Sequence, residues 1–313
     1  MQDSSLRKIA LLSVVLVFTM AMVFLFTFST ESQDKSASLM ERESVANYTI
    51  NPPKIPAKAD FAGESVPLDR FYVREDFDRE LLVNTYWHSS TIQLIKRANR
   101  WFPVVEPILK ENGIPEDFKY LALIESGFTH VVSPRGAAGY WQIMEKTAKE
   151  RGLEVNDYVD ERYNVELATQ TACDYFKDSY ALYENWTLVA ASYNAGQRRI
   201  TESIEKQKVN SYYDLYLNDE TSRYVYRILA AKTILSNPAK YGFQLEESDL
   251  YQPIPYKVIE VNQTIPDLIE FAHSHGVTYR MFKMFNPWLR ESYLQDASGK
   301  VYKIKIPDMK AMK

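Results

Sequence analysis

Residues 118–128 read FKYLALIESGF, and this stretch decides the fold class of the region around it. Its apolar run over residues 120–124 is followed by Glu125 and a Gly–Phe pair, which is typical of a short buried helix that ends at the glycine. Helical spacing puts Leu121 and Ala122 on the same side as Glu125. We therefore expect Glu125 at the edge of the core, in the last turn of this helix.

Two physical effects would act on the carboxylate of Glu125 at such a position. Burial disfavours the charged form, and the negative end of the helix dipole disfavours it further, so both effects raise the pKa. A carboxylic acid that stays protonated near neutral pH is what cleavage of a glycosidic bond requires of its general acid. The alternative is a surface glutamate that merely ends a helix, and Glu125 alone does not decide between the two.

The sequence on either side continues the helical pattern, from about residue 76 to residue 236. We expect an all-α domain there, without internal repeats. Proline is typical of a first helical turn, so we predict that one helix ends near residue 101 and that another begins at Pro103 and ends at Gly113. The other predicted helices begin near residue 115 and cover residues 164–184, 186–195 and 219–236.

The composition of the whole chain is that of a globular protein. It has 313 residues, of which 46% are hydrophobic and 25% charged, and this excludes wholesale disorder. The net charge of −4 lacks the basic footprint of a nucleic-acid-binding protein. The single cysteine, Cys173, excludes an internal disulfide and a cysteine-based zinc site, and the four histidines show no metal-ligand motif. We therefore expect no nucleic acid, no metal and no cofactor.

Three further blocks contain residues suited to binding a polar ligand. Residues 133–144 combine a turn, two glycines and an aromatic segment, and such a loop can bring backbone and amide groups close to a ligand. Within it, Gln142 offers both a donor and an acceptor to sugar amides and hydroxyls. Residues 191–196, ASYNAG, end a helix with a Tyr–Asn pair, and residues 218–224 read NDETSRY.

Together with Glu125, these blocks resemble the motifs of the lytic transglycosylases with the lysozyme-like Slt fold, specifically the membrane-bound murein transglycosylase D group. The family motifs Glu-Ser, Gly-Leu-Met/Trp-Gln, Ala-Tyr-Asn and Glu-Thr-x-x-Tyr appear as ES at 125–126, GYWQ at 139–142, SYN at 192–194 and ETSRY at 220–224. The resemblance covers roughly residues 60–245, and the motifs occur in the family's order. One departure is Glu145, where the family often has proline.

The resemblance implies an enzyme that cleaves the β-1,4 bond between N-acetylmuramic acid and N-acetylglucosamine in peptidoglycan. A typical glycosidase uses two carboxylates, whereas only Glu125 has the family's catalytic setting. Glu125 would first protonate the leaving oxygen and then accept the proton of the substrate's own C6 hydroxyl, which leaves a 1,6-anhydro end and consumes no water. Two alternatives remain open: a hydrolytic muramidase on the same fold, and a peptidoglycan-binding protein without turnover.

The same resemblance implies supporting roles for seven further residues. Tyr193 would hydrogen-bond near the Glu125 carboxylate and hold it, and Tyr224 would do the same or contact the sugar. Ser133 would orient the N-acetyl group or the acid. The residues that would line the muramyl subsite are Gln142, Met144, Thr147 and Asn194. For Tyr193, Tyr224 and Met144 the alternative is simple core packing.

The C-terminal part of the chain reads as a second, small module. Residues 255–307 show the order strand, helix, helix, strand, with alternating residues at 256–261 and 301–306 and helical patterns at 265–275 and 279–285. This order resembles a LysM module, a fold that binds N-acetylglucosamine chains. The alternative is a structural cap that binds no glycan.

The N-terminal part contains a candidate membrane anchor. Residues 9–28 carry no charge, and twenty helical residues span about 30 Å, the thickness of the hydrocarbon core of a bilayer. Arg7 and Lys8 precede the run and acidic residues follow it, so the positive-inside rule places the N-terminus in the cytoplasm and the rest outside, in the periplasm of a two-membrane bacterium. The alternative is a cleaved signal peptide.

We therefore predict four parts: an anchor over residues 1–29, a linker over 30–70, a lytic transglycosylase domain over 71–250 and a LysM-like module over 251–313. The expected fold class is mainly α, with a lysozyme-like all-helical catalytic domain and a small α+β module of βααβ order, preceded by a transmembrane helix. The expected partners are the glycan strands of peptidoglycan and the membrane, and we expect a monomer.

Overall fold

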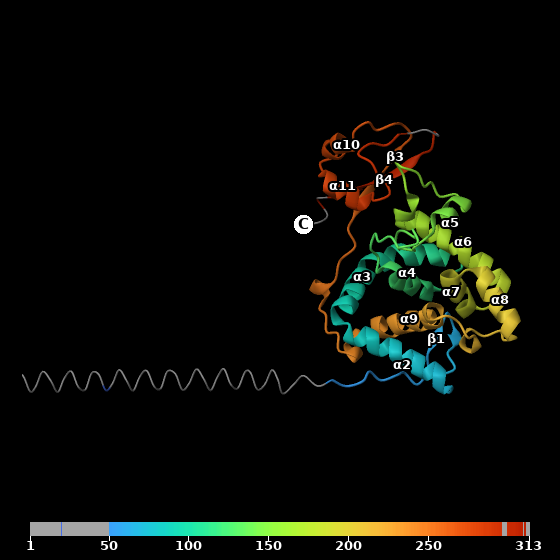
Figure 1. The fold of residues 1–313 in the computed structure, drawn as a ribbon. Coiled ribbons are helices and arrows are strands. Elements are labelled where there is room, and N and C mark those ends of the chain that lie inside the picture. Colours follow the sequence, from blue (N-terminus) through green and yellow to red (C-terminus); the bar gives the residue numbers. More distant parts are fainter. Residues whose placement is uncertain (1–19, 21–49, 296–298, 309, 311–313) are drawn as a thin grey trace, which may run out of the picture. The chain divides into compact units, whose positions relative to one another are not determined.

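The computed structural model describes Met20 and residues 50–295, 299–308 and 310, and most of this part of the chain is helical (Figure 1). Residues 53–313 form one compact unit, separate from residues 1–52. Apart from Met20, the predicted anchor lies outside the described residues. None of the helices in the described ranges combines the length and the apolar character needed to cross a membrane.

Most helices of the larger region follow one another with short connections. In chain order they are α2 (Phe71–Tyr86), α3 (His88–Glu111), η1 (Glu116–Phe118), α4 (Lys119–Ser126), α5 (Glu145–Glu150), η2 (Glu161–Tyr163), α6 (Val165–Tyr183), α7 (Trp186–Ala195), α8 (Gln197–Gln207), η3 (Tyr212–Asp214), α9 (Asp219–Ser236), η4 (Pro238–Tyr241) and η5 (Glu247–Asp249). A longer loop over residues 127–144 separates α4 from α5. The all-α prediction for this region is confirmed.

The short helix α4 lies in the middle of this arrangement. It contacts α3 on one side and α9 on the other, and α2 runs along α9 (Figure 1). Leu121, Ala122 and Leu123 of α4 are completely buried, so burial, rather than the intrinsic stability of an eight-residue helix, holds α4 in place. Any group at the end of α4 is therefore fixed relative to α9.

One helix prediction is wrong. The structure has a single helix α3 with Pro103 and Pro107 inside it, where we expected a helix end near residue 101 and a new start at Pro103. A proline removes one helical hydrogen bond, but Ala98, Val105 and Leu109 are buried along the same helix on both sides of Pro103. Burial of this continuous face outweighs the local cost of the prolines.

The predicted linker also ends earlier than expected, because residues 60–66 belong to the helical region. Strands β1 (Asp60–Phe61) and β2 (Glu64–Ser65) form a small antiparallel pair, and Phe61 is completely buried. The Glu64 carboxylate accepts hydrogen bonds from the backbone N–H of Trp186 (2.5 Å) and of Thr187 (3.0 Å) at the start of α7. These long-range contacts cannot be read from local composition.

The C-terminal module has the predicted order of elements. Strands β3 (Tyr256–Val261) and β4 (Tyr302–Pro307) pair antiparallel, with Tyr256 opposite Pro307 and Val261 opposite Tyr302. Helices α10 (Leu268–Ser274) and α11 (Tyr279–Phe285) lie between them in the sequence. The module has its own buried cluster, which includes Leu268, Phe282 and Ile304.

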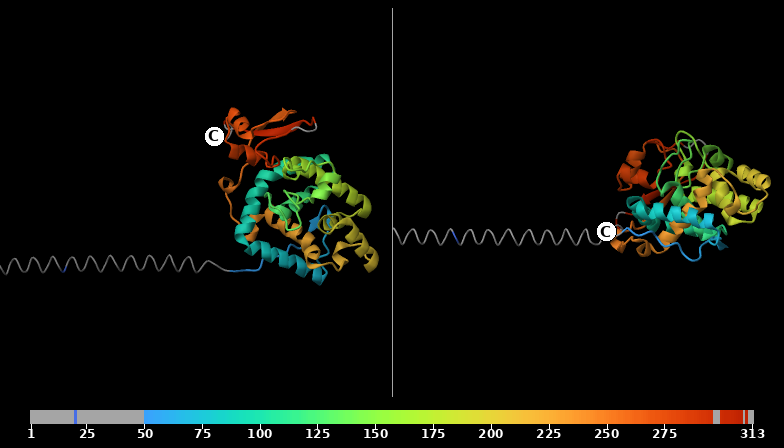
Figure 2. Two further views of the ribbon diagram at one scale, coloured as in Figure 1. Left: turned by 45° about the horizontal axis from the view of Figure 1, so that its top comes forward. Right: turned by 60° about the horizontal axis from the view of Figure 1, so that its bottom comes forward.

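The ribbon of the module lies next to that of the helical region in both views of Figure 2, and polar contacts join the two. Lys300 forms ion pairs with Glu161 (2.5 Å) and Glu154 (3.2 Å), and Lys305 forms one with Glu166. Two backbone hydrogen bonds add to these, from the N–H of Asp160 to the carbonyl of Trp288 and from that of Arg290 to Tyr158, both 2.8 Å long. Ion pairs and backbone hydrogen bonds therefore hold the module against the helices, in addition to the segment that connects them.

Candidate active site

The end of α4 is fixed by a glycine and a serine on either side of the helix terminus. Gly127 has a left-handed backbone (φ +58°), and its N–H donates to the carbonyl of Leu123 (2.8 Å) to close the last turn. The Ser126 hydroxyl donates to the carbonyl of Tyr140 (2.8 Å), which ties the helix end to the next loop. Glu125 lies in this last turn, as expected from the sequence.

Glu125 points toward α9, where the Tyr224 hydroxyl donates a hydrogen bond to its Oε1. Tyr224 is only 1% exposed. Burial raises the pKa of Glu125 above its usual 4.5, the hydrogen bond from Tyr224 and the charge of Arg227 lower it, and the charge of Glu220 raises it; the net shift of the pKa is upward. The carboxyl group of Glu125 therefore keeps its proton to a higher pH than an exposed glutamate does.

Tyr193 lies close by but makes a different hydrogen bond from the one we expected. Its hydroxyl donates to the carbonyl of Trp141 (2.7 Å) rather than to Glu125. Burial and the nearby charge of Glu125 raise the pKa of the Tyr193 hydroxyl well above its usual value, so it stays protonated. Tyr193 thus supports the loop beside Glu125, and Tyr224 provides the direct contact.

The loop that follows α4 approaches the backbone of a neighbouring segment very closely. A Cβ atom on Gly139 (φ +77°) would lie 1.9 Å from the carbonyl oxygen of Arg162, so only glycine fits. The Arg162 guanidinium is paired with Asp160 (2.7 Å) and donates to the carbonyls of Gly136 (2.9 Å) and Ile143 (3.3 Å). Sequence reasoning missed this support, because nothing local links residues 160–162 to the loop.

Several residues predicted to contact substrate line one small cavity of about 90 Å³. These are Gln142, Met144, Thr147 and Tyr193. Met144 is 42% exposed, which does not fit simple core packing. Gln142 has a left-handed backbone (φ +49°), and its amide donates to the carbonyls of Gly139 (2.8 Å) and Val131 (3.0 Å). Within the described part of the chain the oxygen of that amide accepts no hydrogen bond, so it is the group that Gln142 offers to a ligand.

The other three predicted residues do not line this cavity: Tyr224 contacts Glu125 as described, and Asn194 and Ser133 make other contacts. The Asn194 amide donates to Glu220 (3.1 Å) and its oxygen accepts from the Thr221 hydroxyl (2.9 Å), so it joins α7 to the start of α9. The Ser133 hydroxyl accepts from the N–H of Ala137 (3.0 Å) within a turn. Both residues therefore have clear structural contacts of their own.

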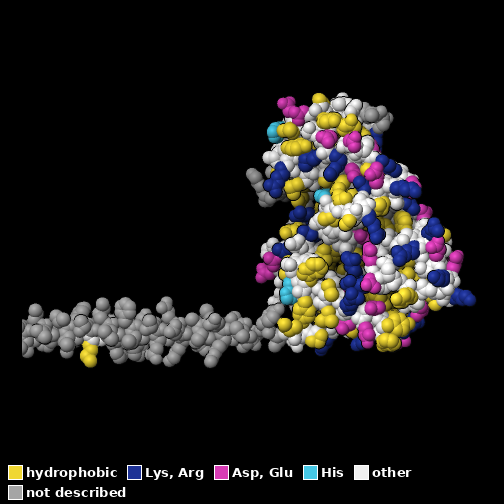
Figure 3. Space-filling view, viewed as in Figure 1, with side chains coloured by type: hydrophobic (Ala, Val, Ile, Leu, Met, Phe, Trp, Pro, Cys, Tyr) yellow, Lys and Arg dark blue, Asp and Glu magenta, His cyan; other side chains and the backbone are white. Residues whose placement is uncertain are grey.

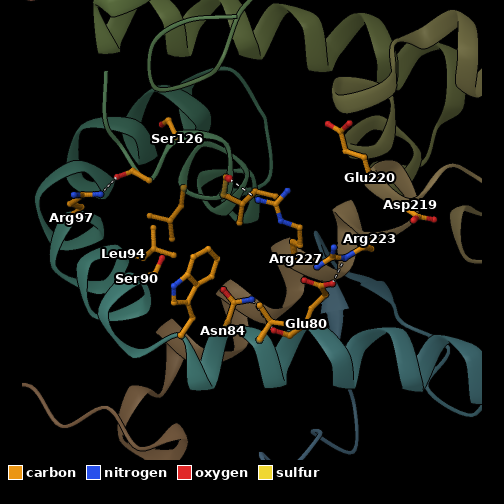
Figure 4. Close-up of a pocket in the computed structure, with 15 residues that line it drawn as sticks. Glu80, Asn84, Ser90, Leu94, Arg97, Ser126, Asp219, Glu220, Arg223 and Arg227 are labelled. Atoms are coloured by element: carbon orange, nitrogen blue, oxygen red, sulfur yellow. Dashed lines mark hydrogen bonds and ion pairs between the residues drawn. The ribbon is translucent and has the colours of Figure 1, made fainter. Parts of the chain in front are cut away.

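A second cavity, of about 600 Å³, lies beside the end of α4 and includes Ser126 and Gly127 in its lining (Figure 4). Glu80 of α2 and Arg223 of α9 point toward each other there and form an ion pair of 2.6 Å. Arg227 donates to the carbonyl of Ile124 (3.1 Å). Basic and acidic side chains are interspersed on the face of the molecule shown in Figure 3.

The contribution of α2 to this cavity was not predicted. Glu80, Asn84 and Trp87 line it, but their stretch of sequence shows no motif. Glu80, which is 2% exposed, follows the buried Phe77 by three residues, and this position on the same helical face is the one signal that could have drawn attention to it.

Metal ions and thiol chemistry find little support in the described residues. No group of three or more His, Cys, Asp or Glu side chains within them is arranged to hold a metal ion. Cys173 is buried, and burial raises the pKa of its thiol to about 12, so the thiol is protonated at neutral pH.

Comparison with known families places both regions. Residues 104–215 match the transglycosylase SLT domain, and residues 257–310 match the soluble lytic transglycosylase C-terminal LysM-like domain. The chain thus combines an SLT domain with a LysM-like domain, and the resemblance inferred from the motifs is confirmed.

Individual relatives agree with this class. The chain is 28% identical over 237 residues to the membrane-bound lytic murein transglycosylase D of Escherichia coli (strain K12), which covers 74% of this chain and 50% of the relative. The protein of the same name from Escherichia coli O6:H1 gives the same values. The chain spans about half the length of these curated relatives. An X-ray structure of an inactive mutant of the lytic transglycosylase Slt from Pseudomonas aeruginosa is 18% identical, with a TM-score of 0.38, and covers 57% of this chain and 35% of that one.

Proposed function

We propose that this protein is a peptidoglycan lytic transglycosylase in which Glu125 acts first as acid and then as base. The observation that carries the proposal is the Glu125–Tyr224 pair: a buried carboxyl group with a raised pKa, held by a buried tyrosine, at the end of a fixed helix in the SLT region. The relatives are named murein transglycosylases, which supports peptidoglycan as the class of substrate.

The first step of the proposed reaction is cleavage of the glycosidic bond. The proton of Glu125 passes to the bridging oxygen, the bond from C1 to that oxygen breaks, and the substrate's N-acetyl oxygen stabilises the positive charge that develops at C1. Glu125 is then ionised. The hydrogen bond from Tyr224 stabilises this form, because a donor lowers the energy of a carboxylate more than that of the neutral acid.

The second step uses the ionised carboxylate as the base. Glu125 accepts the proton of the C6 hydroxyl while that oxygen forms a bond to C1, so the product ends in a 1,6-anhydro ring and the enzyme returns to its starting form. The attack is intramolecular and benefits from a high effective concentration. No water is consumed.

The remaining predicted residues would position the muramyl unit. We assign Gln142, Met144 and Thr147 to one subsite because they share a cavity. Asn194 and Ser133 would act at its borders. We also retain the four predicted parts of the chain, with the linker ending before residue 60, the envelope location and anchoring through residues 1–29, and glycan binding by the LysM-like module.

Hydrolysis on the same fold is the second candidate, because one observation favours it. Glu220 is close enough to raise the pKa of Glu125 and also lines the 600 Å³ cavity, and in a hydrolase it would position a water molecule. Its carboxylate, however, accepts a hydrogen bond from Asn194 (3.1 Å).

Digestion of purified murein sacculi by the full chain in detergent separates these functions. Mass spectrometry should find fragments with anhydro ends, which lack one water relative to reducing ends. Reducing ends would support hydrolysis, and no fragments would support a binding protein. Glu125→Gln should abolish the products, whereas the matched variant Glu145→Gln, on an exposed residue paired with Lys149, should not. Cleavage by Glu125→Gln would refute the assignment.

A further inference from the structure

A third cavity, of about 320 Å³, lies apart from Glu125, where α3 and the loop after α4 meet the LysM-like module. Its lining is mostly apolar and rich in rings, including Trp101 and Tyr140 on one side and Tyr251, Tyr256 and Phe285 on the other. The rings of Trp101 and Tyr140 meet edge to face at 4.9 Å. The size is at the lower end for a ligand pocket and suits one sugar ring.

The walls of this cavity are held in place by hydrogen bonds and an ion pair. The Asn99 amide donates to the carbonyl of Tyr251 (3.2 Å), and Arg100 donates through Nε to the carbonyl of Gln252 (3.0 Å), so the segment before β3 is fixed on α3. On the module side, Lys305 pairs with Glu166 of α6. The cavity is therefore preformed, and a ligand would not have to order its walls.

Two features connect this cavity with the candidate active site and with an acidic ligand. Arg97 lines both this cavity and the 600 Å³ cavity beside α4. Neither Arg97 nor Arg100 forms an ion pair with a carboxylate among the residues that the structure describes. Arg100 lies over the ring of Tyr251 (5.2 Å). Two guanidinium groups are thus available at the edge of an aromatic cavity.

We propose that this cavity binds one N-acetylhexosamine unit of a peptidoglycan glycan strand, outside the residues that surround Glu125. The C–H groups of a sugar face carry a slight positive charge and pack on the negative faces of aromatic rings. Arg97 and Arg100 would face the carboxylate of a muramyl unit or its stem peptide. The choice of a glycan as ligand rests on the proposed function, but the site itself is tested by binding alone.

The test uses the full chain with Glu125→Gln, so that binding is measured without turnover. The probe is tetra-N-acetylchitotetraose with a photoreactive diazirine, and the cross-linked peptides are identified by mass spectrometry. We expect cross-links to the peptide that contains Tyr251 or to Met284, which lines the cavity and is 56% exposed. Tyr251→Ala should reduce them about fivefold, because it removes one aromatic wall.

Two further variants show whether the loss of cross-links in Tyr251→Ala comes from the cavity itself. Tyr216→Ala changes an exposed tyrosine that does not line this cavity and should leave the cross-links unchanged. Met284→Glu places a carboxylate at the cavity and should weaken the cross-links without a change in thermal stability. Unchanged cross-links in both Tyr251→Ala and Met284→Glu, or competition by a free stem tripeptide but not by unlabelled sugar, would overturn the proposal.

The outcomes also separate this site from the proposed function. If the cross-links are absent while sacculi are still cleaved in a Glu125-dependent manner, the cavity proposal fails and the proposed function stands. If the cross-links appear in the cavity while no cleavage occurs, the site stands and the enzyme proposal fails. In an active chain, Tyr251→Ala should raise the apparent KM for sacculi severalfold and leave kcat unchanged.

Discussion

Glu125 at the end of α4 is partly buried, whereas Glu80 in the middle of α2 is almost completely buried, and the two glutamates differ in their partners. Glu80 lines the 600 Å³ cavity, as do Ile124 and Ser126, the two neighbours of Glu125 in the chain. Glu80 on α2 is ion-paired with Arg223 at 2.6 Å, whereas Glu125 on α4 accepts a hydrogen bond from the neutral hydroxyl of Tyr224. A cationic partner in direct contact stabilises the charged form of a carboxylate more strongly than a neutral donor does. At Glu125 the effect of burial outweighs the opposing effects of Tyr224 and Arg227, so the net shift of the pKa is upward. A general acid therefore needs burial together with partners that do not cancel the effect of burial.

The largest effect should come from Glu125→Gln, which keeps the shape of the side chain and removes the proton that it donates. We expect the rate of sacculus cleavage to fall by about a thousandfold or more, because general acid and base roles are lost together. The rate is measured by release of soluble muropeptides. Full activity in a correctly folded Glu125→Gln variant would show that Glu125 is not the catalytic acid.

The second prediction concerns Glu80 of α2, where we expect an effect on stability rather than on catalysis. Glu80→Gln removes the charge that neutralises Arg223, so we expect a loss of about 2 kcal/mol in the free energy of unfolding. Urea denaturation followed by circular dichroism measures it. As control, Glu145→Gln alters an exposed ion pair with Lys149 and should leave the free energy of unfolding almost unchanged. A Glu80→Gln variant that is stable but inactive would move Glu80 into the catalytic machinery.

Tyr224→Phe tests the neutral partner itself. The hydrogen bond from Tyr224 lowers the pKa of Glu125, so its loss should raise that pKa and move the alkaline limb of the activity profile to higher pH. Turnover should fall by about tenfold, because the carboxylate formed in the first step loses a donor.

The control for this variant is Tyr193→Phe. The Tyr193 hydroxyl donates to the Trp141 carbonyl and not to Glu125, so Tyr193→Phe should leave the alkaline limb where it is, even if turnover falls. Equal shifts of the limb in both variants would mean that the loop and not the direct hydrogen bond sets the pKa.

The sequence predicts the helices with local signals well, but it does not predict the contacts between segments that are far apart in the chain. The bounds of α6, α7 and α9 agree with the predictions within about one residue, because Asn caps and apolar periodicity are local signals. Glu125 and its helix end were also visible locally. Three features depend on partners that are far away in the sequence, and no local pattern predicts them. They are the ion pair between Glu80 and Arg223, the continuation of helix α3 across Pro103 and the burial of Phe61.

The smallest effect concerns the pH dependence of stability. Below the usual pKa of 4.5, Glu125 is protonated in both the folded and the unfolded chain and contributes no pH dependence. As the pH rises past that value, the unfolded chain releases its proton while the folded chain retains it, so the raised pKa lowers the free energy of unfolding until the folded pKa is passed.

Glu125→Gln removes this loss of stability with rising pH. Unfolding in urea at a series of pH values should therefore show the variant gaining stability relative to the native sequence as pH rises, whereas Glu145→Gln should show no such gain, because its ion pair with Lys149 lowers the pKa of Glu145. A constant difference between Glu125→Gln and the native sequence across this range would mean that Glu125 is ionised in the folded chain as readily as in the unfolded one, and Glu125 would then not be poised as an acid.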